Sequence, residues 1–157
     1  MKIGGYTFTK ICSIKPMPNA DETIKEFMPQ SRYKLANLTK PNKYGSGPFC
    51  KFNIPKDKAL AGVYAIVSVG SLKYIGECKN LSSRYNNGYG NISPRNCFVG
   101  GQETNCRVNN LILIDAKKGA DLALWLLRTE NYKQVERELL EKYATPWNRR
   151  SLSSSGK

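Results

Sequence analysis

One segment of the chain restricts its fold more than any other feature of the sequence. The stretch GVYAIVSVGSLKYIG, residues 62–76, is rich in β-branched and aromatic residues and contains a glycine turn signal, which predicts an antiparallel β-hairpin. Because side chains alternate between the faces of a strand, the turn sets the register. A two-residue loop at 70–71 would put Tyr64 and Tyr74 on opposite faces. A three-residue loop at 68–70, with its glycine in the left-handed region, would put them on one face, and we favour it.

The segments around the hairpin show recognisable patterns. Asn80 is a suitable N-cap for a short helix over LSSRY, which places Arg84 in its first turn. The breaker-rich stretch at 86–106 is expected to be a long loop, and loops of that length are usually functional. Four further elements are predicted: a helix over 20–28, a third strand over 108–115, a buried apolar helix over 120–129 and a last helix over 132–143.

The last helix contains a carboxylate in an unusual position. At about 100° per residue, Glu136 falls among Val135, Leu139 and Leu140 on the apolar face. The other two acids of the helix, Glu138 and Glu141, fall toward solvent. A carboxylate on a buried face is costly unless it is ion-paired or binds a metal. Glu136 is therefore either the partner of a buried cation such as Arg84 or a ligand for a hard divalent cation.

Charge and composition narrow the class of function. The 157 residues include 25 Lys and Arg against 12 Asp and Glu, a net charge of +13 that is spread over the chain. Such a surplus favours a polyanion, nucleic acid above all. Histidine is absent, so mechanisms that need a histidine base, ligand or catalytic triad are excluded. The five cysteines form no CxxC pair, and we expect reduced thiols.

Taken in order, these residues resemble the GIY-YIG nuclease family, over Gly62 to Asn148. Gly62-Val63-Tyr64 stands for the first tripeptide and Tyr74-Ile75-Gly76 matches the second. Arg84 follows at the family's spacing, Glu136 lies in a helix similar to the family's, and Pro146-Trp147-Asn148 ends the pattern.

The resemblance implies a mixed α/β (α+β) domain, with a short, mainly antiparallel three-stranded sheet flanked by helices, that cleaves DNA phosphodiesters with one divalent metal, Mg²⁺ or Mn²⁺. It implies that Tyr64 activates the attacking water, Arg84 holds the scissile phosphate and Glu136 binds the metal. Tyr74 would line the site, and Asn148 would support the helix or the surroundings of the metal. A phenol with a pKa of about 10 needs nearby positive charge to act as a base, which Lys73, Arg84 or the metal would supply.

One position departs from the family pattern. The family usually has His or Tyr four residues after the arginine, where this chain has Gly88. Tyr85 and Tyr89 flank that position, and we favour Tyr89, reached by a local bulge at Gly88. If neither tyrosine entered the site, the alternative would be a catalytically impaired nucleic-acid-binding module with the same fold.

The sequence also gives expectations about organisation and partners. We expect a basic N-terminal extension at 1–60, the nuclease domain at 61–150 and a flexible tail at 151–157. The N-terminal extension could also be an adaptor for a protein partner. The polar side chains of the long loop are of the kind that reads base edges: Asn91, Arg95, Asn96, Gln102, Asn105 and Arg107.

DNA is the expected partner, and the sequence leaves RNA and a homodimer open. No apolar run is long enough to span a membrane and no secretory signal is visible, so we expect a cytoplasmic protein. Nothing else on the chain suggests a separate repair or homing module, so we expect a stand-alone enzyme of a restriction or defence type.

Overall fold

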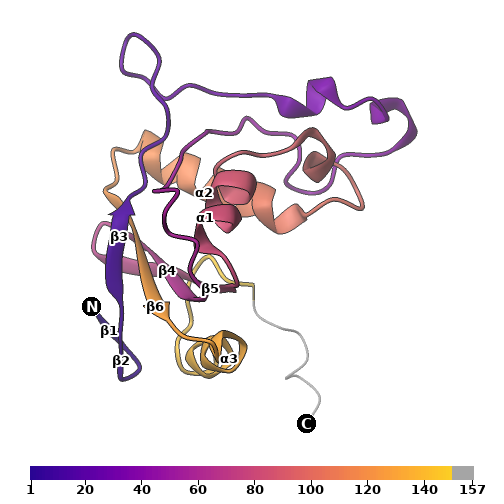
Figure 1. Cartoon of the computed structure of the whole chain (residues 1–157). Helices are drawn as coiled ribbons and strands as arrows, with labels where there is room; N and C mark the ends of the chain where they lie inside the picture. Colours follow the sequence, from indigo (N-terminus) through magenta and orange to yellow (C-terminus); the bar gives the residue numbers. More distant parts are fainter. Residues whose placement is uncertain (150–157) are drawn as a thin grey trace.

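A four-stranded antiparallel sheet forms the centre of the molecule, with the strand order β3-β6-β4-β5 (Figure 1). The computed structural model describes residues 1–149, so the tail predicted at 151–157 lies outside the described residues. Strand β4 (Gly62–Ser68) pairs with both β5 (Ser71–Cys78) and β6 (Leu122–Arg128). Strand β3 (Thr9–Ser13) pairs with β6 at the opposite side. Strand β5 is therefore an edge of the sheet.

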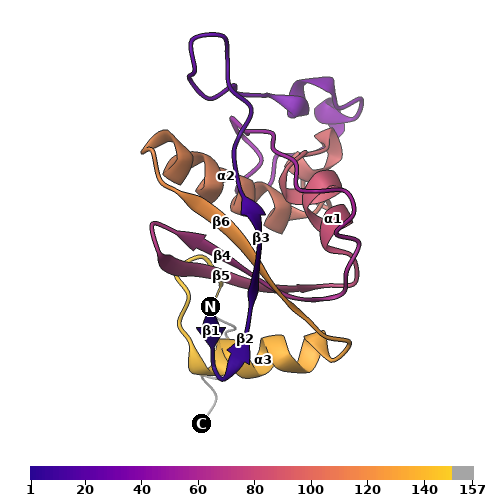
Figure 2. The ribbon, with the colours of Figure 1, turned by 60° about the vertical axis from the view of Figure 1, so that its left-hand side comes forward.

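Helices cover both faces of the sheet (Figure 2). Helix α1 (Leu81–Arg84) and helix α2 (Glu103–Lys117) pack on one face, where Leu81, Val108 and Ile112 are buried. Helix α3 (Tyr132–Lys142) packs on the other face through two buried side chains. The remaining elements are short: β1 (Lys2–Ile3), β2 (Tyr6–Thr7), the 3-10 turns η1 (Pro29–Arg32), η2 (Ala36–Leu38) and η4 (Pro94–Cys97), and the π-helical turn η3 (Tyr85–Tyr89).

The predicted class, a mixed α+β fold with a mainly antiparallel sheet, is confirmed. The sheet has one strand more than predicted, because residues of the N-terminal segment form β3. That segment also places Phe52 and Ile54 in the main core, against side chains of the sheet and α2. Residues before position 60 are thus packed into the same core as the hairpin.

Two predicted elements were wrong: a predicted strand is part of a helix, and a predicted helix contains a strand. The stretch 108–115, expected as a strand, lies in helix α2, and 120–129, expected as a buried helix, contains strand β6. Alternate residues of β6 face the two cores, with Leu122, Leu124 and Leu126 on one side and the half-buried Trp125 on the other. A strand covered on both faces is apolar throughout, so the alternation that identifies a strand is lost from its sequence.

The helix predicted at 20–28 is also absent. This stretch begins as a tight turn in which the Asn19 N–H donates to the Thr23 carbonyl at 2.7 Å, followed by an isolated bridge between Phe27 and Phe49. Asp21 accepts hydrogen bonds from the backbone and hydroxyl of Thr23, an arrangement that competes with helix formation.

All five cysteines are free thiols, as expected, and four of them are buried. Among the helices of residues 1–149, none has the length and apolar character that a membrane span requires.

Candidate active site

A two-residue turn connects β4 to β5. Val69 and Gly70 both have positive φ, 50° and 72°, as a type I′ hairpin turn requires, and Ser68 pairs with Ser71. The predicted three-residue loop was therefore wrong. By simple alternation from this turn, Tyr64 and Tyr74 would lie on opposite faces.

A β-bulge in β5 reverses that outcome. Val67 pairs with Leu72, whereas the preceding Ile66 pairs with Tyr74, so Lys73 is an extra residue in the strand. The extra residue shifts the alternation by one and turns Tyr74 to the face of Tyr64, with ring centroids 6.1 Å apart. The prediction that both tyrosines share one face is confirmed, and the bulge is its cause.

The glycine of the second tripeptide makes room for the tyrosine of the first. Gly76 pairs with Tyr64 across the two strands, and the Tyr64 ring lies over the glycine. A Cβ at position 76 would lie 2.4 Å from both Cζ and the hydroxyl oxygen of Tyr64, closer than any real contact. Only glycine allows Tyr64 to cross the neighbouring strand and reach the sheet edge.

Arg84 is positioned by a short, capped helix. The Asn80 Oδ1 accepts a hydrogen bond from the Ser83 N–H at 2.9 Å, which confirms Asn80 as the N-cap of α1. The guanidinium of Arg84 is half-buried. Burial acts to lower the pKa of Arg84, but the electrostatic effect of the nearby phenol groups of Tyr64 and Tyr89 is opposite, and the pKa is raised. Arg84 is therefore fully charged at the sheet edge.

A π-helical turn follows Arg84 directly and selects Tyr89. The turn η3 is closed by a hydrogen bond from the Gly90 N–H to the Tyr85 carbonyl at 2.7 Å, one residue longer than an α-helical turn. The Tyr89 hydroxyl lies 2.6 Å from the Tyr64 hydroxyl. The Tyr85 hydroxyl is buried without a hydrogen-bond partner in the described structure. The bulge expected at Gly88 is this turn.

The side chain of Asn109, on α2, is hydrogen-bonded to the π-helical turn and to the N-terminal segment. Its Nδ2 donates to the Tyr89 carbonyl at 2.7 Å and to the Cys50 carbonyl at 2.9 Å, and its Oδ1 accepts from the Cys50 N–H at 3.0 Å. Asn109 is fully buried. This role could not be predicted from the sequence, because position 109 was expected in a strand.

Glu136 lies at the edge of the sheet on the side covered by α3. Val135 and Leu139 are buried and Glu136 is half-buried, so the expected position beside the apolar face is confirmed. Burial, with repulsion from Glu77, raises the pKa of Glu136 to about 7, although Arg84 acts to lower it. Within residues 1–149, Glu136 forms no ion pair, so the expected alternative of a salt bridge to Arg84 is not formed.

Glu77 is a second carboxylate that the prediction missed. It follows Gly76, and strand alternation turns it to the α3 side of β5. There its negative charge acts to raise the pKa of Glu136. The alternation of β5 would have predicted that Glu77 lies near Glu136 only if the face of the sheet that α3 covers had been known.

One cavity of about 440 Å³ brings these groups together. Five residues predicted from the family pattern line it: Tyr64, Tyr74, Arg84, Tyr89 and Glu136. Gly76, Glu77, Gln102, Thr104 and Asn105 complete the lining. The cavity thus combines tyrosine hydroxyls, one arginine and two carboxylates at the exposed edge strand.

Two tyrosines of the cavity, Tyr64 and Tyr89, hold their protons more tightly than a free phenol does. Burial raises the pKa of Tyr64 well above its usual value, and the neighbouring tyrosines add to the effect. Burial also raises the pKa of Tyr89 and of Tyr85. At neutral pH these phenols are therefore hydrogen-bond donors as well as acceptors.

Two predicted catalytic residues lie outside the lining of the cavity. Lys73 is the extra residue of the bulge, and its carbonyl accepts a hydrogen bond from the Trp147 N–H at 2.9 Å. Asn148 forms a two-point clamp on the edge strand, because its Oδ1 accepts from the Ile75 N–H at 2.9 Å and its Nδ2 donates to the Ile75 carbonyl at 2.8 Å. Asn148 therefore fixes the strand between Tyr74 and Gly76.

The predicted DNA-reading residues do not form one surface. Gln102 and Asn105 line the cavity and are hydrogen-bonded to each other at 3.2 Å. Asn91 and Arg95 are exposed away from it, and the Oδ1 of Asn96 accepts from the Gln102 N–H.

Arg107, the last of the residues expected to read DNA, lies in the interior instead of on a loop. It is buried on α2, and its guanidinium donates to the Trp147 carbonyl. The loop assignment failed here because the expected loop at 86–106 contains η3, η4 and the start of α2.

Comparison with known proteins supports the fold. The chain is similar in structure to a glutamate-to-alanine mutant of EndoII from bacteriophage T4, with a TM-score of 0.50, 18% sequence identity and 92% of each chain covered. At this identity the likeness concerns the fold alone. No model of a protein family matches the sequence, and no curated protein matches it.

Proposed function

We propose that the protein is a metal-dependent endonuclease of the GIY-YIG type that hydrolyses DNA phosphodiester bonds. The observation that carries the proposal is the cavity at the edge of β5, which gathers Tyr64, Tyr74, Arg84, Tyr89 and Glu136 from separate elements. The similarity of the fold to a phage endonuclease agrees with it. The net charge of +13 suits a nucleic-acid substrate.

The carboxylates of the cavity are suited to a hard divalent cation. Glu136 is half-buried with a raised pKa beside Glu77, so two like charges lie close together without a paired cation in residues 1–149. No group of three or more His, Cys, Asp or Glu in that range could hold a metal. Water and phosphate oxygens would therefore complete the ligands of Mg²⁺ or Mn²⁺, as is usual for Mg²⁺. When bound, the cation would polarise the phosphate and acidify a water molecule.

Hydrolysis forms a bond from the water oxygen to phosphorus and breaks the bond from phosphorus to the 3′ oxygen. Arg84 stabilises the negative charge that increases on the phosphoryl oxygens. A proton leaves the water, and the leaving 3′ oxygen gains one. Because Tyr64 is protonated at neutral pH, it can accept the proton of the water only while releasing its own. The Tyr89 hydroxyl, 2.6 Å away, takes the proton that Tyr64 releases. Tyr89 is itself protonated, so it passes its own proton on to water in the cavity.

The alternative, a binding module without catalysis, is motivated by Gly88 in place of a tyrosine or histidine and by the basic charge. The π-helical turn brings the hydroxyl of Tyr89 to the cavity from the next position, which favours the catalytic hypothesis. The narrower hypothesis of a restriction or defence role is motivated by the full set of family residues on a basic domain, without a recognisable repair or homing module. A lower plating efficiency of phage on cells that express the protein is its test.

The proposal is tested by incubating the purified protein with supercoiled plasmid and with RNA, with Mg²⁺, Mn²⁺ or EDTA. We expect cleavage of DNA that requires metal and is lost in Tyr64→Phe and Glu136→Ala. Glu138→Ala is the matched control, because Glu138 lies on the same helix but contacts Tyr6 at 3.0 Å, away from the cavity. Uncut DNA at every salt and metal concentration, or variants as active as the unaltered protein, would overturn the proposal.

A further inference from the structure

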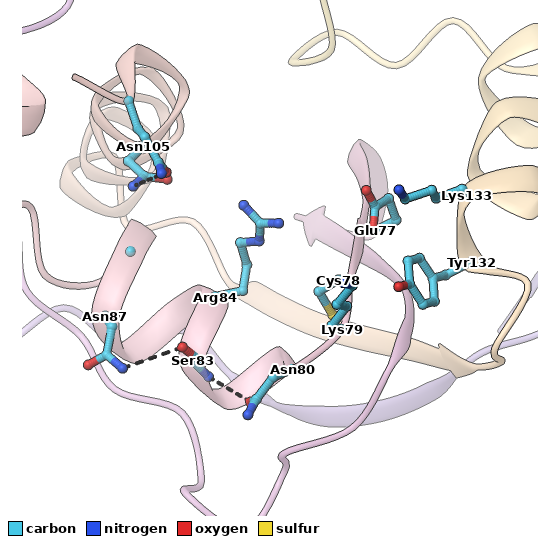
Figure 3. A pocket seen from close by; sticks show the side chains of 12 residues that line it. Glu77, Cys78, Lys79, Asn80, Ser83, Arg84, Asn87, Asn105, Tyr132 and Lys133 are labelled. Carbon is cyan, nitrogen blue, oxygen red and sulfur yellow. Dashed lines mark hydrogen bonds between the residues drawn. The ribbon is translucent and has the colours of Figure 1, made fainter. Parts of the chain in front are cut away.

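A second cavity lies beside the first and shares a wall with it. It has a volume of about 450 Å³ and is lined by residues of the β5–α1 connection, α1, η3, α2 and the start of α3. Figure 3 shows Arg84 between the two sides of this cavity, with Asn105 on one side and Lys133 and Tyr132 on the other. Arg84, Glu77, Gln102 and Asn105 line both cavities. Anything bound in one is therefore adjacent to anything bound in the other.

The second cavity is more cationic than the first. Lys79, Arg84 and Lys133 line it, against the single carboxylate of Glu77. In the described part of the chain, the ion pairs of lysine involve Lys58 and Lys117 and neither of the two lysines of this cavity. Both ammonium groups are thus available to an anionic ligand.

Neutral hydrogen-bonding groups complete the lining. Ser83 and Asn87 lie side by side, with the Asn87 Nδ2 3.5 Å from the Ser83 hydroxyl oxygen (Figure 3). Because Ser83 accepts in this contact, its hydroxyl proton is free to be donated. Hydroxyl and amide donors near two ammonium groups match the oxygens of a phosphodiester.

We propose that this second cavity binds the phosphate that adjoins the scissile phosphate on the same strand, with Lys79 and Lys133 as its charged contacts. The inference rests on the proposed function, in which the scissile phosphate lies at Arg84. The next phosphate is one nucleotide away along the strand. Because Arg84 lines both cavities, a DNA strand that runs from the first cavity past Arg84 places that phosphate in the second cavity.

The test compares Lys79→Ala/Lys133→Ala with Lys118→Ala/Lys142→Ala, which removes two exposed lysines elsewhere and gives the same net charge. Binding to a short duplex is measured in EDTA over a range of salt concentrations, after thermal melting has shown that both variants are folded. We expect the first variant to lower the slope of log affinity against log salt by about 1, since the one phosphate that both lysines neutralise contributes about 0.9. The control variant should change the slope by much less.

Duplexes with a single neutral methylphosphonate then locate the contact. The unaltered protein should bind more weakly when the phosphate next to the cleavage site is replaced, and the Lys79→Ala/Lys133→Ala variant should show no such loss. An unchanged KM and an unchanged methylphosphonate effect in that variant, with cleavage intact, would overturn the cavity assignment and leave the nuclease function standing. A protein that never cleaves but shows the lysine-dependent salt slope would overturn the nuclease function and keep an anion site here.

Discussion

The ring of Tyr64 lies across Gly76 on the neighbouring strand, so closely that a Cβ at position 76 would come within 2.4 Å of the Tyr64 hydroxyl oxygen. Gly76→Ala must therefore displace Tyr64 from the cavity. We expect a loss of about 1–3 kcal/mol of stability, as for other overpacked cores, together with loss of cleavage. Gly88→Ala is the control, because a Cβ there would lie 3.6 Å from Asn105 Oδ1, an ordinary contact. Thermal melting of both variants checks the prediction, and equal melting temperatures would contradict it.

Removing single hydroxyl groups separates the two tyrosines that flank Gly88. Tyr89→Phe removes the partner of the Tyr64 hydroxyl, and we expect kcat to fall by about 100-fold or more, as when a group that transfers protons is removed. Tyr85→Phe removes a buried hydroxyl that has no partner within residues 1–149, so stability and kcat should change little. Steady-state cleavage kinetics measure both, and the opposite ranking would assign the position to Tyr85.

The raised pKa of Glu136 makes the stability of the metal-free protein depend on pH. Burial and repulsion from Glu77 raise this pKa from 4.5 to about 7, against the attraction of Arg84. The folded state therefore binds the proton more tightly than the unfolded state. This contribution to stability is complete below about pH 4.5 and is lost as the pH rises through about 7. Melting temperatures measured in EDTA over a range of pH should show this decrease in the unaltered protein and a flatter pH profile in Glu136→Gln. In Glu77→Gln the decrease should be centred at a lower pH. Identical profiles for all three would refute the assignment.

Asn109 ties the π-helical turn to the N-terminal segment. Asn109→Ala would leave the Tyr89 carbonyl and both backbone groups of Cys50 without these partners in the interior. We expect a loss of about 2–4 kcal/mol, since buried polar groups without partners are costly. Asn110→Ala removes one partly exposed bond to Tyr44 and should cost about 1 kcal/mol. Chemical denaturation compares the two, and a similar midpoint for both would show that Asn109 does not support the turn.

Residues 1–55 are expected to be necessary for folding. Their removal would delete β3, which pairs with β6, and Phe52, which is buried in the main core. The remaining chain would expose the edge of β6 and an apolar face, so we expect insoluble or unfolded protein. Soluble yield and circular dichroism test this outcome. A folded fragment that still cleaves DNA would instead identify the segment as an adaptor.

Much of the site could be predicted because it depends on local patterns. Asn80 caps α1 through a contact within one turn, and Glu136 lies beside the apolar face that the helical period gives it. The types of two longer elements could not be predicted. The apolar residues of helix α2 include a short run, 111–114, that resembles a strand. Strand β6 is covered on both faces, so its period of two is hidden.

By itself the sequence determined which chemical groups the protein can use: tyrosine, arginine and carboxylate without histidine, on a strongly basic chain. Only the tertiary structure decided which of these groups meet. The bulge at Lys73 turns Tyr74 toward Tyr64, and the π-helical turn brings in Tyr89 in place of Tyr85. Edge-strand alternation puts Glu77 near Glu136. Each of these outcomes depends on contacts between segments that are distant in the chain, and a pattern of neighbouring residues does not record such contacts.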